Sequence, residues 1–144
     1  MKYLFDASAL LNLVRRLGEE SLEPLRGNRI LTLTVYEVGN ALWRETSLLK
    51  RLKAGEAEEI MRAVTALTKF MEVIGPEDPV EILRASNEIR LTFYDAAYVV
   101  EALRENLTLV TDDEKLAAKI EEHEGMFLKE YKKKLRVIGS AELR

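Results

Sequence analysis

Short apolar runs alternate along this chain with longer segments in which apolar residues recur at helical spacing. The runs lie at 3–5, 30–33, 70–74, 107–110 and 135–138, and each has the length of a strand. The first four lead within a few residues into a segment of helical period. Alternating strands and helices are typical of α/β proteins built around a parallel sheet. We therefore predict an α/β fold with a central, mostly parallel sheet.

Start and stop signals divide the helical segments. Gly18 ends the first, Gly55 separates two helices, and Asp78 followed by Pro79 is a typical helix start. The expected helices cover 9–17, 34–49, 60–67, 79–89, 92–105 and 113–120. The chain has 144 residues, 47% of them hydrophobic, and we find no repeat or linker. This length is typical of a single domain, so we expect one domain over residues 1–144.

The composition restricts the chemistry that this chain can perform. It contains no Cys and one His, His123, which excludes disulfides, Cys-based metal sites, thiol nucleophiles and paired-His sites. Catalysis would have to rely on carboxylates, hydroxyls, Lys or Arg. No apolar run approaches the ~18 residues of a membrane span. We expect a cytoplasmic protein that makes no membrane contact.

Carboxylates fall at the points where the predicted strands give way to helices. Asp6 follows the first strand, Glu37 and Asp95 lie in first turns of helices, and Asp112 and Asp113 follow the strand at 107–110. In an open parallel sheet such junctions share the carboxyl edge, where ligands bind. Acids that are distant in the sequence are therefore expected to converge there.

Helix capping is the competing interpretation of these acids. Thr34 with Glu37, Thr92 with Asp95 and Thr111 with Glu114 each fit or approximate a capping box, and Asp6 has the position of an N-cap. Acids in the first turn of a helix are also stabilised by its dipole. Several carboxylates on one edge nevertheless repel one another unless a cation neutralises them.

An all-oxygen acidic cluster suits a hard divalent cation. Mg²⁺ and Mn²⁺ take carboxylate oxygens, keep several waters and complete their shell with phosphate oxygens. A metal ion in such a site can lower the pKa of a bound water and stabilise negative charge on a phosphoryl oxygen. The cluster therefore predicts Mg²⁺- or Mn²⁺-dependent chemistry on phosphodiesters, for which no His is needed.

Four segments together resemble one known family. They are 3–10 (YLFDASAL), 34–38 (TVYEV), 91–98 (LTFYDAAY) and 109–113 (LVTDD). Their order and spacing over nearly the whole chain resemble the PIN domain, and more narrowly the VapC-type toxins of toxin–antitoxin pairs. The resemblance implies a three-layer α/β/α PIN-like fold and metal-dependent endoribonuclease activity.

The resemblance also assigns residues. It implies catalytic roles for Asp6, Glu37, Asp95 and Asp113, with Asp6, Asp95 and Asp113 as the metal-binding acids. The family usually shows Thr-x-Asp at the fourth motif, which favours Asp113, although Asp112 could share or replace its role. Ser8 and Thr111 match hydroxyl positions that orient the acids or contact phosphate, and helix capping is the alternative for both.

Partners follow from the same resemblance. It implies an RNA substrate, often tRNA or rRNA, a VapB-type antitoxin and a homodimer. Leu48, Leu49 and Leu52 would suit an antitoxin groove, unless they lie in the core. Two basic groups could follow an RNA backbone or simply face solvent. They comprise Arg15, Arg16, Arg44, Lys50, Arg51 and Lys53, and Lys129, Lys132, Lys133, Lys134 and Arg136.

Two other functions fit part of the pattern. The first is a non-catalytic PIN-like module that binds RNA or protein, in which the acids only cap helices. The second is a Mg²⁺-dependent phosphatase with a nucleophilic Asp. Such a phosphatase would be expected to carry Asp-x-Asp after the first strand, and Ser8 stands at the second of these positions.

Overall fold

A computed structural model describes residues 2–144, and in these residues five strands form a single parallel sheet. The strand order across the sheet is β3-β2-β1-β4-β5, and every neighbouring pair is parallel. The strands are β1 (Tyr3–Phe5), β2 (Arg29–Leu31), β3 (Glu72–Ile74), β4 (Thr108–Val110) and β5 (Val137–Ile138). The predicted parallel sheet is therefore confirmed.

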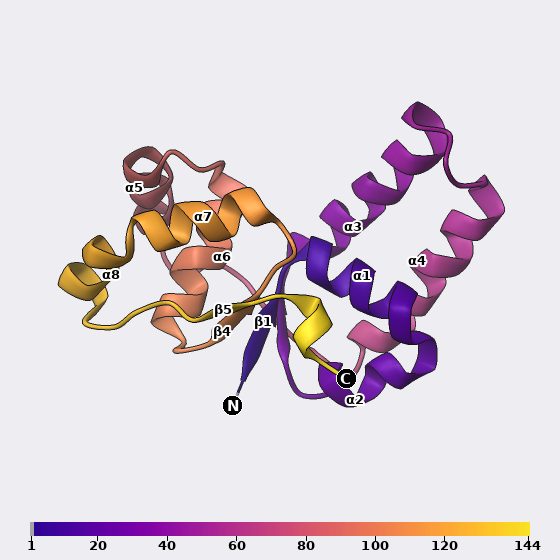
Figure 1. Cartoon of the computed structure of the whole chain (residues 1–144), viewed down its shortest axis with the longest axis horizontal. Helices are drawn as coiled ribbons and strands as arrows, with labels where there is room; N and C mark the ends of the chain where they lie inside the picture. The colour runs from indigo at the N-terminus through magenta and orange to yellow at the C-terminus, as the bar shows by residue number, and fades with distance from the viewer. Residues whose placement is uncertain (1) are drawn as a thin grey trace.

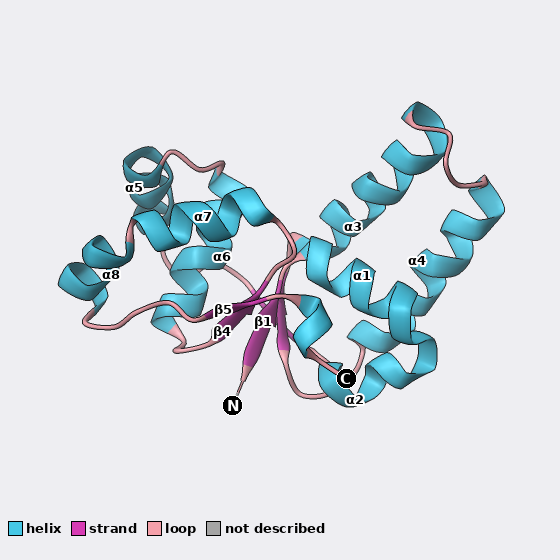
Figure 2. Cartoon of the chain, in the orientation of Figure 1, coloured by secondary structure: helices cyan, strands magenta, loops and turns pink. Residues whose placement is uncertain are grey.

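Helices cover both faces of this sheet (Figure 1). One side carries α1 (Ala7–Leu17), α2 (Leu22–Leu25), α3 (Thr34–Trp43) and α4 (Ala54–Thr68). The other side carries α5 (Pro79–Ile89), α6 (Phe93–Arg104), α7 (Glu114–Glu122) and α8 (Glu124–Tyr131). Figure 2 shows the strands as the middle of three layers, which is the α/β/α arrangement expected.

Alternate residues of the strands pack into two separate hydrophobic cores, one on each face of the sheet. Leu4 and Leu109 pack in the cluster formed with α5–α8, whereas Phe5 and Val110 pack in the cluster on the α1–α4 side. All four are fully buried. Strands buried on both faces are apolar at successive positions rather than at every second one, which explains the continuous apolar runs.

No helix in residues 2–144 has the length and apolar character needed to cross a membrane.

The end of α1 and the start of α5 lie where the sequence predicts them. Gly18 ends α1 with φ +56° and ψ −128°, a backbone conformation that disfavours residues with a Cβ. Asp78 caps α5, accepting hydrogen bonds from the Val80 and Glu81 backbone N–H groups, and Pro79 is the first helical residue.

Other boundaries differ from the prediction. The helix expected over 34–49 is α3 followed by a π-helical turn, Arg44–Leu48, in which none of the residues is buried. β1 has the expected bounds, the other four strands are shorter than their apolar runs, and α8 was not expected. Apolar side chains such as Phe127 recur beyond His123, but Glu124 and Gly125 give no clear start signal there.

The topology fixes where a ligand site can form. β1 is followed along the chain by β2 on one side of it in the sheet, and β4 lies on its other side. The strand order thus reverses between β1 and β4, whose register pairs Phe5 with Val110. Ligands of open α/β sheets bind beyond the carboxyl ends of the strands at such a switch point.

Candidate active site

Asp6 lies at this switch point, directly after β1. Its backbone N–H donates to the Val110 carbonyl at 3.0 Å, which ties it to the end of β4. Its Oδ1 accepts hydrogen bonds from the Ala9 N–H at 2.9 Å and the Ser8 hydroxyl at 2.7 Å, and its Oδ2 accepts from the Thr111 hydroxyl. Burial raises the pKa of Asp6 to about 6, although these three hydrogen bonds oppose the rise.

Glu37 projects from the first turn of α3 and is held from across the sheet by α6. The Tyr98 hydroxyl donates to Glu37 Oε1 at 2.8 Å and also contacts Thr34 Oγ1 at 2.7 Å. Thr34 Oγ1 in turn accepts the Leu31 backbone N–H at 3.0 Å. Burial raises the pKa of Glu37, and the charges of Asp95 and Asp6 raise it further.

Asp95 and Asp113 complete a set of interacting acids. Asp95 lies in the first turn of α6, and its backbone N–H donates to the Thr92 hydroxyl at 3.1 Å. Burial raises the pKa of Asp95, and the charge of Asp113 adds to that rise. The charges of Asp6 and Asp95 thus act on the pKa of Glu37, and the charge of Asp113 acts on the pKa of Asp95. The structure therefore brings together the four acids on which the sequence analysis focused.

Asp112 points to a different environment from its neighbour. It accepts hydrogen bonds from the Ser140 backbone N–H at 2.7 Å, the Ser140 hydroxyl at 2.5 Å and the Asn12 side-chain amide at 2.8 Å. Burial alone would raise its pKa, but these bonds and the Arg16 charge hold the pKa of Asp112 below its ordinary value. The charge of Asp112 raises the pKa of Asp6, whereas the pKa of Glu37 and that of Asp95 are raised by the charges of other carboxylates.

Two of the expected capping boxes do not form. Thr34 is the first residue of α3 rather than its cap, and its hydroxyl bonds Leu31 and Tyr98 instead. Thr111 does not cap α7. Asp113 does, by accepting from the Lys115 and Leu116 N–H groups, and the Thr111 hydroxyl is used by Asp6. The physical reason in both cases is a polar partner from another element, which local sequence spacing does not reveal.

The capping interpretation is correct for two other positions. Thr92 caps α6 by accepting the Asp95 N–H, and Asp6 caps α1 by accepting the Ala9 N–H. The Ser8 and Thr111 hydroxyls both donate to the Asp6 carboxylate. Asp6 and Asp113 thus cap helices and also belong to the interacting set of acids.

The sequence profile described as the PIN domain matches residues 3–121. The chain belongs to the PIN domain family. This match confirms the resemblance carried by the four acidic segments, and it extends over every acid described above.

Individual relatives agree with the family assignment. Over 120 residues this PIN domain is 39% identical to a protein of Pyrobaculum aerophilum named exonuclease VapC9, with 83% of this chain and 86% of the relative covered. A crystal structure of PAE2754 from Pyrobaculum aerophilum matches with a TM-score of 0.71 and 37% identity. That match covers 83% of this chain and 79% of the other.

The donor set of this PIN domain suits a hard cation. Its side chains offer carboxylate and hydroxyl oxygens, and Cys is absent from the sequence. Over residues 2–144, no group of three or more His, Cys, Asp or Glu side chains is already arranged to hold a metal ion. The charges of neighbouring acids raise the pKa of Glu37 and of Asp95, and a bound divalent cation would offset this repulsion.

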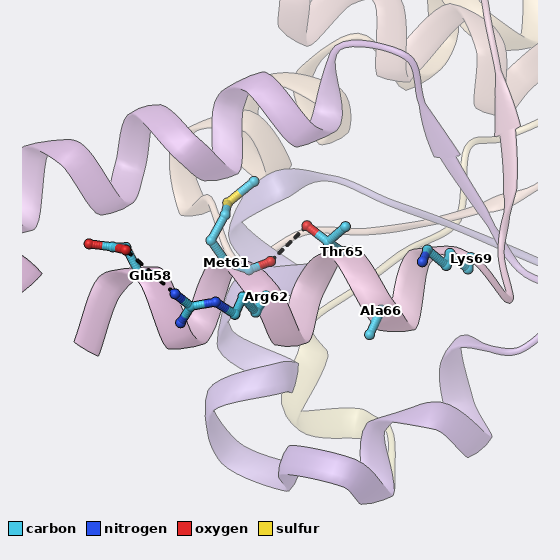
Figure 3. A pocket seen from close by; sticks show the side chains of 6 residues that line it. All are labelled: Glu58, Met61, Arg62, Thr65, Ala66 and Lys69. Atoms are coloured by element: carbon cyan, nitrogen blue, oxygen red, sulfur yellow. Dashed lines mark hydrogen bonds and ion pairs between the residues drawn. The ribbon is translucent and has the colours of Figure 1, made fainter. Parts of the chain in front are cut away.

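Two surface hollows of the PIN domain are lined by residues other than the four acids. Figure 3 shows one of about 390 Å³, lined by six side chains of α4 and its C-cap, in which Glu58 pairs with Arg62 at 3.5 Å. A larger apolar groove of about 860 Å³ runs between α4 and the end of α1. Neither is lined by any of the four acids, so the site is defined by its chemistry rather than by cavity size.

Several large apolar side chains of α3 and the turn that follows it are exposed. In α3, Tyr36 is 80% exposed and Trp43 is 51% exposed. Figure 1 shows α3 and α4 projecting together away from the sheet. Leu48 and Leu49 are exposed as well, whereas Leu52 is partly buried against the core. Arg15 pairs with Glu45, and Arg16 donates to the Ser140 and Leu143 carbonyls, so both have structural contacts.

Sequence reasoning missed three residues of the site. Tyr98 holds Glu37, while Asn12 and Ser140 hold Asp112. Tyr98 carries one available signal, because it follows Asp95 by three positions and therefore lies near it on the helix. For Asn12 and Ser140 no such signal exists, since 100 and 28 positions separate them from Asp112.

Proposed function

We propose that this PIN domain is a Mg²⁺- or Mn²⁺-dependent nuclease of the VapC type that cuts RNA phosphodiesters endonucleolytically in the cytoplasm. The observation that carries the proposal is the mutual electrostatic effect of Asp6, Glu37, Asp95 and Asp113 at the switch point of the sheet. The similarity to a protein named exonuclease VapC9 supports nuclease chemistry.

Each acid has a role that its surroundings suit. Asp6, Asp95 and Asp113 would hold the ion, which when bound supplies an activated water and stabilises charge on the phosphoryl oxygen. Asp6 is kept in one orientation by Ser8, Ala9 and Thr111. Tyr98 occupies Oε1 of Glu37 and leaves Oε2 to accept a proton, for which its raised pKa is suited.

Cleavage of a circular RNA tests both the chemistry and its endonucleolytic mode. Wild type with Mn²⁺ should linearise the circle and leave 5′-phosphate and 3′-hydroxyl ends, and chelation should stop the reaction. The Asp95→Asn variant should be inactive, whereas Asp78→Asn, which changes a capping aspartate of α5, should cleave normally. Cleavage of linear RNA alone would indicate an exonuclease. Full activity of metal-stripped Asp95→Asn would contradict the mechanism.

A non-catalytic binding module is the second candidate, because Asp6 and Asp113 do cap helices. The two functions differ in what Mn²⁺ does. Capping acids alone should give no saturable binding in a calorimetric titration, whereas the proposed nuclease should bind Mn²⁺ and lose that binding in Asp95→Asn.

We also propose a VapB-type antitoxin and a homodimer as partners. α3 and the turn that follows it expose Tyr36, Trp43, Leu48 and Leu49, and the groove between α1 and α4 is lined by Val14, Leu22, Ile60, Ala63 and Leu67 among others. Large apolar surfaces of this kind mark protein contacts. If a short DNA-binding protein is encoded beside this gene, its co-expression should give a complex that inhibits cleavage, and a neighbour that forms no complex would contradict this partner. Sedimentation of the chain alone should give twice its 16.5 kDa mass.

A further inference from the structure

The C-terminal segment, residues 137–143, is fastened to the acidic edge through Asp112. Ser140 donates to Asp112 from both its backbone N–H and its hydroxyl. Arg16 of α1 donates to the Ser140 carbonyl at 2.8 Å and the Leu143 carbonyl at 3.0 Å, which fixes the same segment from the other side. Gly139 is packed so closely that a Cβ there would lie 3.3 Å from Asp112 Oδ1.

The backbone of Asp112 faces the site while its side chain faces this segment. Its N–H donates to the Ser8 hydroxyl at 3.0 Å, and that hydroxyl donates to Asp6. The Thr111 N–H donates to the Ile138 carbonyl at 3.0 Å, while the Thr111 hydroxyl donates to Asp6. The turn of residues 111–113 is thus held on one side by the C-terminal segment and on the other by Asp6.

Hydrogen bonds distinguish Asp112 from the four acids, although its charge also raises the pKa of Asp6. The charges of other carboxylates raise the pKa of Glu37 and of Asp95. Both carboxylate oxygens of Asp112 accept hydrogen bonds, Oδ1 from the Ser140 N–H and Oδ2 from the Ser140 hydroxyl and the Asn12 amide. Asp112 therefore ties the 111–113 turn to α1 and to the C-terminal segment, which none of the four acids does.

We propose that Asp112 is a positioning residue, which uses Ser140 and Asn12 to hold the 111–113 turn so that Thr111 orients Asp6 and Asp113 faces Asp95. This inference rests on the proposed nuclease function and deepens it. It also gives a role to the C-terminal segment, which lies beyond residues 3–121 matched by the PIN domain profile. Partners that orient the ligands of a metal typically change metal affinity or activity by ~10–100-fold.

Three single variants, one double variant and two reference variants test the proposal by Mn²⁺ calorimetry, hydrogen exchange and steady-state kinetics. Asp112→Ala should weaken Mn²⁺ binding and lower kcat by ~10–100-fold with little change in KM. Ser140→Ala should act in the same direction but less strongly, and adding it to Asp112→Ala should cause no further loss. Asp112→Asn keeps an oxygen acceptor for the Ser140 N–H and should be mild. In Asp112→Ala, exchange should accelerate at 108–113 and 137–143.

The references separate positioning from stability and from direct metal binding. Asp78→Ala removes a helix cap far from the acids and should lower stability without changing Mn²⁺ affinity, whereas Asp113→Asn should lose binding. If Asp112→Asn loses binding as completely as Asp113→Asn while Ser140→Ala binds normally, Asp112 is a ligand and the proposal is wrong. Unchanged Mn²⁺ affinity and kcat in Asp112→Ala also overturn it. A wild type that binds no Mn²⁺ contradicts the proposed function itself, and this inference with it.

Discussion

Asp6 couples stability to pH, because burial raises its pKa from 3.8 to about 6. The folded protein therefore holds a proton on Asp6 more tightly than the unfolded chain does. Between these two pKa values the folded state binds more protons, so this group's contribution to stability falls as pH rises. The loss is complete above about pH 6 and amounts to about 3 kcal/mol at one pKa unit per 1.36 kcal/mol.

Replacing Asp6 with Asn should remove this pH-dependent cost. We expect metal-free Asp6→Asn to match wild type in free energy of unfolding near pH 4 and to exceed it at pH 7, by up to about 3 kcal/mol. Urea unfolding with a chelator at pH 4, 5, 6 and 7 measures the difference. Asp78→Asn is the matched control, since that aspartate caps an exposed helix start. A pH-independent difference between wild type and Asp6→Asn would contradict the assignment.

Tyr98 joins α3 and α6 through a single hydroxyl that is almost fully buried. Tyr98→Phe would remove its contacts with Glu37 and Thr34 and leave the Thr34 hydroxyl short of a partner. We expect a loss of ~1–3 kcal/mol of stability and a lower kcat, since Glu37 is no longer held. Tyr94→Phe makes the same chemical change at a position of α6 that is 59% exposed and should alter neither quantity. Equal behaviour of the two variants would exclude a special role for Tyr98.

The acids of the site could be predicted from the sequence, but the residues that hold them could not. Asp6, Glu37 and Asp95 stand at junctions that periodicity alone locates, and a parallel sheet brings such junctions together. Tyr98, Asn12 and Ser140 act through contacts between distant elements. Such contacts depend on how the layers pack, which no local spacing encodes.

At the scale of elements, the sequence predicted what is buried better than where each element ends. β1 and β4 follow from their apolar runs because both of their faces are covered. The helix expected to reach residue 49 continues to Leu48, but its last part, Arg44–Leu48, is a π-helical turn in which no residue is buried. Apolar spacing located this helix but did not indicate the change of helix type where the core does not constrain the chain.

Two glycines offer a paired test of how helices α1 and α3 are built. Gly18 ends α1 at φ +56°, whereas Gly39 lies inside α3, and no atom lies within 4 Å of a Cβ added at either position. Gly18→Ala should therefore cost ~1–3 kcal/mol through backbone strain alone. Gly39→Ala should stabilise the protein by ~0.5–1 kcal/mol, because Ala is the better helix former. Thermal unfolding of both variants measures these opposite signs, and a stabilising Gly18→Ala would show that α1 does not end as described.

At the scale of the whole molecule, the site draws on both helical layers. Asp6 caps α1 and Glu37 lies in α3 on one face, whereas Asp95 lies in α6 and Asp113 caps α7 on the other. A divalent ion held by acids of both layers would therefore bind only when the sheet and both layers are assembled. Metal binding should then be linked to global unfolding rather than to one element.

This linkage predicts that Mn²⁺ stabilises the entire fold. At a free concentration of 100 times its Kd, a ligand specific for the folded state adds about 2.7 kcal/mol to the free energy of unfolding. Wild type should show this gain in a single cooperative transition, and a chelator should reverse it. Asp95→Asn should unfold at the same temperature with and without Mn²⁺, while being at least as stable as wild type in the absence of metal because one repelling charge is gone. A Mn²⁺-induced gain of equal size in Asp95→Asn would place the ion elsewhere on the molecule.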